Sequence, residues 1–318
     1  MKKLLIAILV VVLMATVVLT GCTTAKTNLI MATGGTSGTY YSFGGAICQI
    51  YNTKLDNMNV TAQSTGASKE NIRLIGSKEA ELAIVQNDVM DYAYQGIELF
   101  NGEKIQNIRT VAILYPEIIQ IVVSPDSGIN SIADMKGKRI SVGDAGSGVE
   151  ANAKQILEAY GLTFDDIQAS HLSFSESASA FKDKQLDGFF VTAGSPNPAI
   201  QEITALSSIK LLSVDDATAD MLIAKYPFYT KYSISKETYK GMESDANTLA
   251  VMATLIAGSE LEEDVVYKLT KALFEYQTEL ATAHAKGNEM RLATAVQGVS
   301  VPFHPGAEKY YKEKGLLE

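Results

Sequence analysis

The feature that most restricts the fold is an alternation of short apolar segments with amphipathic segments along most of the chain. Segments of β-type composition occupy residues 29–32, 60–63, 82–85, 110–114, 118–124, 139–142, 189–192 and 210–212. Apolar residues recur every three or four positions, as in amphipathic helices, at residues 41–51, 69–76, 149–160, 177–184 and 262–286. This alternation predicts an α/β fold built in layers.

Composition limits the size and the partners of the protein. The chain has 318 residues, 47% of them apolar and 20% charged, which fits a folded protein of two ordinary domains. A formal net charge of −9 disfavours a nucleic-acid partner, because binding to phosphates requires clustered positive charge. An acidic surface does not exclude a local site for an anionic solute.

The N-terminus has the pattern of a lipoprotein secretion signal. Lys2 and Lys3 precede an apolar segment at residues 4–19, which runs into the sequence LTGC at residues 19–22. A transmembrane anchor is the alternative, but about 16 apolar residues fall short of the roughly 20 that span a bilayer. We therefore predict a signal peptide at residues 1–21 and a lipidated tether at residues 22–27. Cys22 would carry the lipid, including palmitate, and hold the protein outside the cytoplasm, in the periplasm or at the cell surface.

No catalytic, metal or cofactor motif is found in the sequence. His171, His284 and His304 are scattered and lack the spacing of metal ligands. Ser147 is not in a nucleophile elbow, because Ala145 stands where the first glycine of GxSxG is needed. Cys48, which would be the only thiol beside a lipidated Cys22, is interpreted as a buried small residue in a helix. We predict a protein that is not an enzyme and that needs no cofactor.

The sequence contains a weak internal duplication. The apolar segment 29–32 runs into the loop TGGTSG at residues 33–38, and the segment 140–142 runs into GDAGSG at residues 143–148; a predicted helix follows each loop. About fifty residues later each unit ends in an acidic-flanked strand, AELAIV at 80–85 and QLDGFFV at 185–191. The pattern favours two similar lobes, although any α/β protein repeats strand, loop and helix.

Three polar loops follow predicted strands. They are TGGTSG at residues 33–38, STGAS at 64–68 and GDAGSG at 143–148. Glycine-rich backbone N–H groups at a helix start favour an anion, and crevices at strand ends are where open α/β sheets bind ligands. Simple strand-to-helix turns and helix caps remain the alternative reading of each loop. Nucleotide fingerprints are absent from all three.

Taken together, the motifs resemble the TAXI (TRAP-associated extracytoplasmic immunogenic) solute receptors of TRAP transporters. The matching segments are TGGTSGTYYSFGG (33–45), STGASKENIRLI (64–75), AELAIVQNDV (80–89), ILYPEIIQIVV (113–123), DMKGKRISVGDAGSGVEANA (134–153), LDGFFVTAGSPNPAI (186–200), KYPFY (225–229), EDVVYKLTKALFE (263–275) and PFHPGAEKYYKEKG (302–315). The resemblance implies a type II periplasmic-binding-protein fold, with a ligand cleft between two α/β lobes. Lobe I would comprise residues 28–118 and 254–318, and lobe II residues 119–253, with crossings near residues 115–120 and 247–253.

The resemblance also implies which residues line the cleft. Matched loop by loop, they are Thr36, Ser37, Tyr40, Ser64, Thr65, Gly66, Gln86, Asn87, Tyr115, Gly146, Ser147, Ala193 and Gly194. Tyr92 and Tyr94 are interpreted as packing residues.

The function implied is that of a receptor that passes a small solute to a sodium-coupled TRAP permease in the membrane. The solute would be a carboxylate-bearing organic anion or an amino acid, with glutamate, glutamine or 2-oxoglutarate typical of the family. The alternative is a lipid-anchored sensory module that binds the same ligand and signals to a membrane protein; this sequence does not separate the two. An enzyme is the third hypothesis, disfavoured by the absence of a catalytic set.

The sequence also suggests how a carboxylate would be held. The four arginines, Arg73, Arg109, Arg139 and Arg291, all lie outside the three polar loops. We therefore expect backbone N–H groups and hydroxyls at helix starts, rather than an arginine clamp, to bind the carboxylate.

The lipid anchor can be tested directly. We expect Cys22→Ser to accumulate as an unlipidated precursor, because the thiol that accepts the lipid is gone, whereas Cys48→Ser should be processed and acylated normally. Incorporation of labelled palmitate in growing cells measures both. Labelling of the Cys22→Ser protein at the wild-type level would contradict the prediction.

Overall fold

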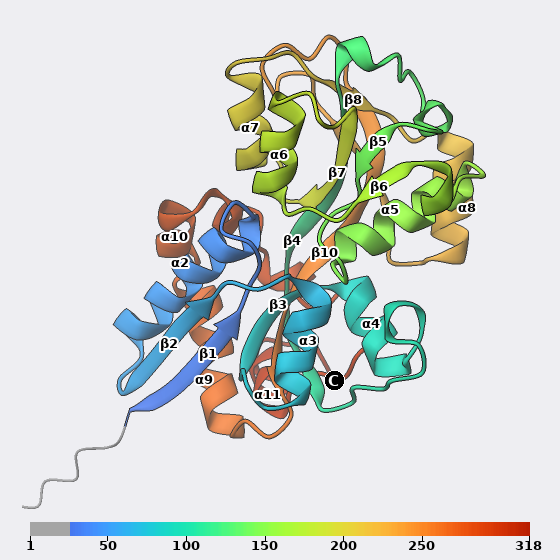
Figure 1. Ribbon diagram of the computed structural model, residues 1–318. Helices are drawn as coiled ribbons and strands as arrows, with labels where there is room; N and C mark the ends of the chain where they lie inside the picture. The colour runs from blue at the N-terminus through green and yellow to red at the C-terminus, as the bar shows by residue number, and fades with distance from the viewer. Residues whose placement is uncertain (1–25) are drawn as a thin grey trace, which may run out of the picture.

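The computed structural model describes residues 26–318 as two α/β lobes joined by two long strands (Figure 1). The predicted signal peptide and the lipidation site Cys22 lie outside the described residues. None of the helices within residues 26–318 is long and apolar enough to cross a bilayer.

Lobe I is formed by the two ends of the described chain. Its N-terminal elements are β1 (Thr27–Ala32), α2 (Thr39–Lys54), β2 (Met58–Gln63), α3 (Ser68–Gly76), β3 (Leu82–Gln86), α4 (Asn87–Gln95) and η2 (Glu98–Phe100). Its C-terminal elements are α9 (Glu263–Glu275), α10 (Gln277–Ala283), η6 (Ala285–Asn288), η7 (Leu292–Thr294) and α11 (Pro305–Glu313). Tyr310 and Tyr311 of α11 pack with Phe274 of α9, ring centroids about 6 Å apart, in the buried core of this lobe.

Lobe II is formed by the middle of the chain. Its elements are η3 (Pro125–Ser127), η4 (Ile132–Met135), β5 (Arg139–Ser141), α5 (Gly148–Ala159), η5 (Phe164–Asp166), β6 (Gln168–Ser170), α6 (Phe174–Lys182), β7 (Gly188–Ala193), α7 (Pro198–Thr204), β8 (Lys210–Leu212), α8 (Asp216–Lys225) and β9 (Thr230–Ile234). Apolar side chains of α5 and α8, including Ile156 and Leu222, are buried against its strands.

The strands β4 (Ile108–Val123) and β10 (Ala246–Gly258) run through both lobes as an antiparallel pair (Figure 1). The hydrogen-bonded order is β2-β1-β3-β10-β4-β7-β5-β6. The unit β1-α2-β2-α3-β3 gives the order 2-1-3 next to β10, and β5-α5-β6-α6-β7 gives 6-5-7 next to β4. Both units are parallel and have the same topology, as the duplication in the sequence predicts. The boundaries proposed from the sequence, after residues 118 and 253, fall inside β4 and β10.

Two expectations about single elements were wrong. Residues 110–114 and 118–124 form one continuous strand, β4, because Pro116 is tolerated opposite Met252 next to an irregular step in the ladder with β10. Residues 262–286 are not one helix: α9 ends at Glu275, α10 begins at Gln277, and η6 closes the segment. The expected α/β class and two-lobed architecture are confirmed.

Cys48 occupies the position expected of a structural residue. It is buried in α2, 5% exposed, and burial raises the pKa of its thiol to about 12. A thiol held neutral in this way is a poor nucleophile.

Candidate functional site

A cleft between the lobes lies where the carboxyl ends of the parallel strands meet. The cleft has a cavity volume of about 50 Å³, within a total empty space of about 520 Å³ that includes open solvent. The lining residues are Gly34, Gly35, Ser37, Gly38, Thr39, Tyr40, Ala67, Ser68, Gln86 and Glu117 of lobe I, and Asp144, Ser147, Gly148, Val149, Ser173, Phe174, Thr192 and Ala193 of lobe II. Both lobes therefore contribute polar groups to one small space.

The start of α2 lines this cleft and has no side-chain cap. Gly38, the residue before the helix, has no side chain that could cap it. The backbone N–H of Gly38 donates a hydrogen bond to Gly35 O at 2.8 Å. Thr39 and Tyr40 in the first turn line the cleft. An uncapped helix start carries roughly half a positive charge, so it favours an anionic group in front of it.

The floor of the cleft is a buried acid. Glu117 on β4 is 2% exposed, and its Oε2 accepts a hydrogen bond from Tyr40 Oη at 2.5 Å. This is its one hydrogen bond within residues 26–318, so Oε1 remains available at the cleft that the side chain lines. Burial raises the pKa of Glu117 to about 8, with a further rise from Asp88, while Tyr40 and Lys286 pull it down.

Two buried polar atoms in the cleft have no partner in the described part of the chain. They are Gln86 Oε1 at the end of β3 and Thr192 Oγ1 on β7. Their side chains are 2% and 4% exposed. Because an unpaired buried polar atom costs about 1–3 kcal/mol, a solute that hydrogen-bonds to either atom would offset that cost.

The wall of lobe II is made by the starts of α5 and α6. Ser147 Oγ accepts from Glu150 N at 3.2 Å and so caps α5, which leaves the hydroxyl hydrogen free to donate. Ser173 caps α6 in the same way, and Phe174 follows it into the cleft. Asp144 lines the same wall; burial, Glu176 and Glu70 raise the pKa of its carboxyl.

Five of the residues implied by the resemblance meet in this cleft. They are Ser37, Tyr40, Gln86, Ser147 and Ala193. They come from two strand ends, two helix starts and the loop between β1 and α2, so only the folded chain brings them together.

Residues 64–66 of the second polar loop support the first loop, whereas Ala67 and Ser68 of the same loop line the cleft. Ser64 Oγ donates to Gly34 O at 3.0 Å, and Thr65 Oγ1 donates to Asn71 Oδ1 at 2.6 Å. Gly66 N is bound by Glu70 Oε2 at 2.7 Å. These contacts hold the backbone of residues 33–34 in place beneath the cleft.

The remaining implied residues lie around the cleft. Thr36 is exposed on the first loop, and Asn87 Oδ1 accepts from Met252 N at 3.0 Å on β10. Tyr115 is fully buried below the floor, with its ring 5.4 Å from that of Phe43. Gly194 packs on Lys286, and Gly146 lies outside the cleft.

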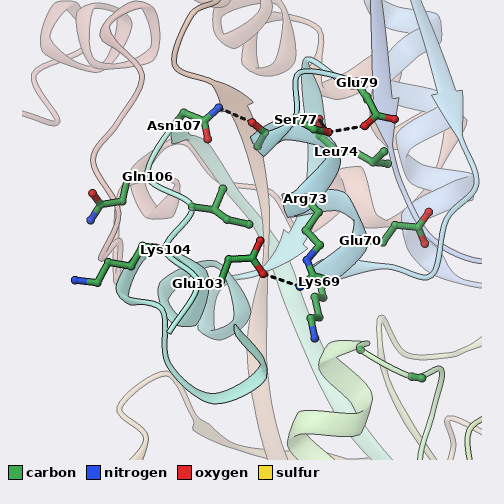
Figure 2. Close-up of a pocket in the computed structure, with 14 residues that line it drawn as sticks. Lys69, Glu70, Arg73, Leu74, Ser77, Glu79, Glu103, Lys104, Gln106 and Asn107 are labelled. Atoms are coloured by element: carbon green, nitrogen blue, oxygen red, sulfur yellow. Dashed lines mark hydrogen bonds and ion pairs between the residues drawn. The ribbon is translucent and has the colours of Figure 1, made fainter. Parts of the chain in front are cut away.

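Gly146 lines a larger hollow that differs chemically from the cleft. This groove of about 810 Å³ runs along α3 and residues 103–107 (Figure 2). Some of its polar side chains are paired: Arg73 with Glu103 at 2.6 Å and Ser77 with Glu79 at 2.8 Å, as Figure 2 shows. This groove is wide and exposed, whereas the cleft gathers polar groups of both lobes in a small space, so we place the site in the narrower cleft.

No arginine lines the cleft. Arg73 pairs with Glu103, Arg139 with Asp187 at 2.6 Å, and Arg109 and Arg291 donate to nearby backbone carbonyls. Lys286 is close behind the wall, but its Nζ is bound by Glu289 at 2.5 Å and by Ser195 O at 3.0 Å.

Residues 26–318 hold no group of three or more His, Cys, Asp or Glu side chains that could bind a metal ion. His304 caps α11, His284 contacts Ser42 at 3.1 Å, and His171 lies 3.2 Å from Glu150. Each histidine thus has a local structural contact.

The two lobes touch along one side of the cleft. Asn152 Nδ2 of α5 donates to Asp88 Oδ2 of α4 at 3.0 Å, and Gln155 Nε2 donates to Tyr92 Oη at 3.0 Å. A side chain on Gly148 would place its Cβ 1.7 Å from Gln86 Oε1, so this close approach requires glycine. The structure therefore shows the lobes closed on each other.

Sequence reasoning missed several lining residues. Glu117 is an acid inside an apolar strand, a signal that charge is needed at a buried position. Ser173 and Phe174 follow β6 as Ala67 and Ser68 follow β2, so the duplication could have located them. Thr192 gives no signal in the sequence.

The fold and the cleft together define the class: the chain has the two-lobed architecture of the type II periplasmic solute-binding proteins. The model of the NMT1-like family matches residues 31–315, so the chain belongs to that family. The resemblance to the TAXI group in particular remains a prediction.

Solved structures share this fold at low identity. PhnD1 from Prochlorococcus marinus, in complex with methylphosphonate, is 10% identical over 91% of this chain and 99% of its own, with a TM-score of 0.55. The alkanesulfonate-binding protein SsuA from Xanthomonas axonopodis pv. citri, bound to MOPS, is 14% identical over 92% and 96%, with a TM-score of 0.51. A putative L-cystine ABC transporter from Listeria monocytogenes is 14% identical over 81% and 94%, also with a TM-score of 0.51.

The contact between Asp88 and Asn152 predicts how the lobes respond to mutation. Asn152→Leu leaves the buried Asp88 carboxylate without its donor from lobe II, which should shift the equilibrium toward open lobes by about tenfold or more at pH 7.5. We expect a larger radius of gyration in small-angle scattering without solute. Because the pKa of Asp88 is raised to about 6, the effect should shrink below that pH, where the acid is neutral.

The matched control is Lys154→Ala on the same helix, whose side chain is exposed and pairs only with Glu158. An Asn152→Leu protein with the radius and pH response of this control would show that the contact does not hold the lobes closed.

Proposed function

We propose that the protein is an extracytoplasmic receptor that captures a small carboxylate-bearing solute and delivers it to a TRAP-type permease, without catalysis. The observation that carries the proposal is the cleft between two lobes, in which Gln86 Oε1, Thr192 Oγ1 and Glu117 Oε1 have no hydrogen-bond partner among residues 26–318. Groups of this kind bind and orient a solute, whereas no nucleophile with an activating base lies among them.

The carboxylate is held by the helix starts. The first turn of α2 is uncapped at the cleft, and Ser37 and Ser147 add hydroxyl donors beside it. All four arginines are engaged elsewhere, which supports binding by backbone N–H groups and hydroxyls. A solute that contacts both lobes stabilises the closed form, because its binding site is complete only when the lobes meet.

The proposals of a TRAP permease as partner and of a membrane anchor are based on the sequence. TGGTSGTYYSFGG, ILYPEIIQIVV and the other segments of the TAXI resemblance span nearly the whole mature chain, and LTGC at residues 19–22 supports a lipid tether. A lipid-anchored sensory module is the alternative that shares the same cleft. The sulfonate, phosphonate and cystine named for the structural neighbours describe those proteins and leave the solute of this chain open.

Transport provides the test of the proposed function. Native mass spectrometry of the purified protein should reveal a bound small solute, and this solute should enter proteoliposomes that contain the permease when a sodium gradient is applied. Uptake driven by ATP without sodium would show that the partner is another class of transporter and not a TRAP permease. Binding with no uptake by either route would favour the sensory module.

Thr192→Val tests the cleft itself. It removes a hydroxyl that has no protein partner and keeps the side-chain shape. We expect solute binding about ten- to a hundredfold weaker by calorimetry, since a hydrogen bond to a charged group contributes about 1.5–3 kcal/mol. The melting temperature without solute should not fall, because no bond within the protein is lost.

Thr270→Val is the matched control: its hydroxyl donates to Val266 O at 2.7 Å inside α9, so stability should drop while binding stays unchanged. Arg73→Gln, Arg109→Gln and Arg139→Gln should likewise leave affinity intact. Loss of binding in one arginine variant, together with normal binding by Thr192→Val, would contradict binding by helix starts and hydroxyls and would indicate an arginine clamp.

A further inference from the structure

We propose that Glu117 Oε1 accepts a hydrogen bond from the ammonium group of the solute, so that the cleft selects a zwitterionic amino acid over the oxo acid or dicarboxylate of the same shape. This inference rests on the receptor function proposed above. It names the charge of the solute and assigns the residue that selects it.

The first argument is the position of the acid. Glu117 is buried on β4, and Tyr40 Oη fixes its Oε2 at 2.5 Å. The other oxygen lies at the cleft without a hydrogen-bond partner among residues 26–318. A buried carboxyl oriented by one bond and open at its second oxygen is arranged to accept a hydrogen bond from a ligand.

The second argument is the charge of the lining. Among residues 26–318, two carboxylic acids, Glu117 and Asp144, line the cleft, and no lysine, arginine or histidine does. Lys286 is held behind the wall by Glu289 and Ser195. A solute with two negative charges would meet two carboxyl groups without a cation, whereas an ammonium group offsets one of them.

The third argument is the spacing of opposite charges. Tyr40 stands in the first turn of α2, and its hydroxyl reaches Glu117. The anion-attracting start of α2 and the acid are therefore separated by one tyrosine side chain. A molecule of amino-acid size spans that distance with its carboxylate at the helix start and its ammonium at the acid.

A proton is linked to this interaction. Four ionisable groups lie around Glu117: Tyr40 of α2, Asp88 of α4, Lys286 of η6 and Tyr115 of β4. Without solute, burial raises the pKa of Glu117 to about 8, so the acid is largely neutral at pH 7. An ammonium group binds the carboxylate form, so its binding releases the proton. Affinity should then rise by up to tenfold per pH unit from pH 6 to 8 and level off above.

An oxo acid would behave in the opposite way. Its carbonyl or carboxylate would accept a hydrogen bond from the neutral acid, so its affinity would be constant below about pH 8 and fall above it. The sign of the pH dependence thus separates the two classes of solute.

The experiment compares matched pairs of probes on protein unfolded, freed of co-purified solute and refolded. The pairs are L-glutamate with 2-oxoglutarate, L-alanine with pyruvate and L-leucine with 4-methyl-2-oxopentanoate, measured by calorimetry from pH 6 to 9 in buffers of different ionisation enthalpy. We expect at least one amino acid to bind about tenfold or more tightly than its oxo partner, with release of close to one proton at pH 7.

Glu117→Gln keeps the shape and the bond from Tyr40 but cannot ionise. It should lose proton release and bind the amino acid about a hundredfold more weakly. Glu117→Asp should retain proton release with reduced affinity, and Glu103→Gln on the outer groove is the control that changes neither. Circular dichroism melting checks that each variant is folded; if Glu117→Gln does not fold, the pH dependence and proton release of the wild-type protein decide.

Three results overturn the inference: tighter binding of the oxo partner, affinity for the amino acid that does not rise with pH, or binding of no amino acid at millimolar concentration. The receptor function would still stand if mass spectrometry finds another solute in the cleft. Failure of the receptor function itself would appear as a protein that carries and binds no solute at all.

Discussion

The antiparallel pair β4–β10 is the contact on which the rest of the molecule depends. Each parallel unit attaches to one of these two strands, β3 to β10 and β7 to β4, so the pair sets the position of one lobe relative to the other. Its ladder is irregular near Pro116, where Met252 N–H donates a hydrogen bond to the side chain of Asn87. Glu117 pairs with Val251 one residue further on, so the floor of the cleft is built on the strands that join the lobes.

Charge in the cleft follows from the same arrangement. Parallel strands end at the cleft from both sides, and each is followed by a helix whose start faces inward. The start of α2 lacks a side-chain cap, whereas Ser147 and Ser173 cap α5 and α6 with their own hydroxyls. Lobe I therefore offers free N–H groups and a buried acid, and lobe II offers hydroxyls and Asp144. A solute with both signs of charge satisfies these groups together.

The sequence predicted the main elements because their patterns are local. Gly-rich loops 33–38 and 143–148 stand between strand and helix as expected, and their repetition reflects two units of identical strand order. The prediction of elements from the sequence failed where long-range packing overrides the local pattern. Pro116 indicates a break, yet β4 continues through it because β10 pairs with β4 before, at and after Pro116, and β7 pairs with it from Ile118 onward. The crossing predicted near residues 247–253 is part of a long central strand, β10, which pairs with β3, β4 and β9.

The sequence by itself determined the class of fold and the residue types available for binding, since periodicity and turn chemistry act over a few neighbouring residues. The family resemblance in the sequence named five residues that line the cleft, Ser37, Tyr40, Gln86, Ser147 and Ala193, and folding brings them together. Only the tertiary structure decided that Ser64 and Thr65 hydrogen-bond to the first loop and that Asn87 accepts a hydrogen bond from β10. It also decided that Glu117 and Thr192 line the cleft. These roles depend on which carbonyl, amide or oxygen lies within hydrogen-bond distance, and that is fixed only when segments up to 165 residues apart in the chain meet.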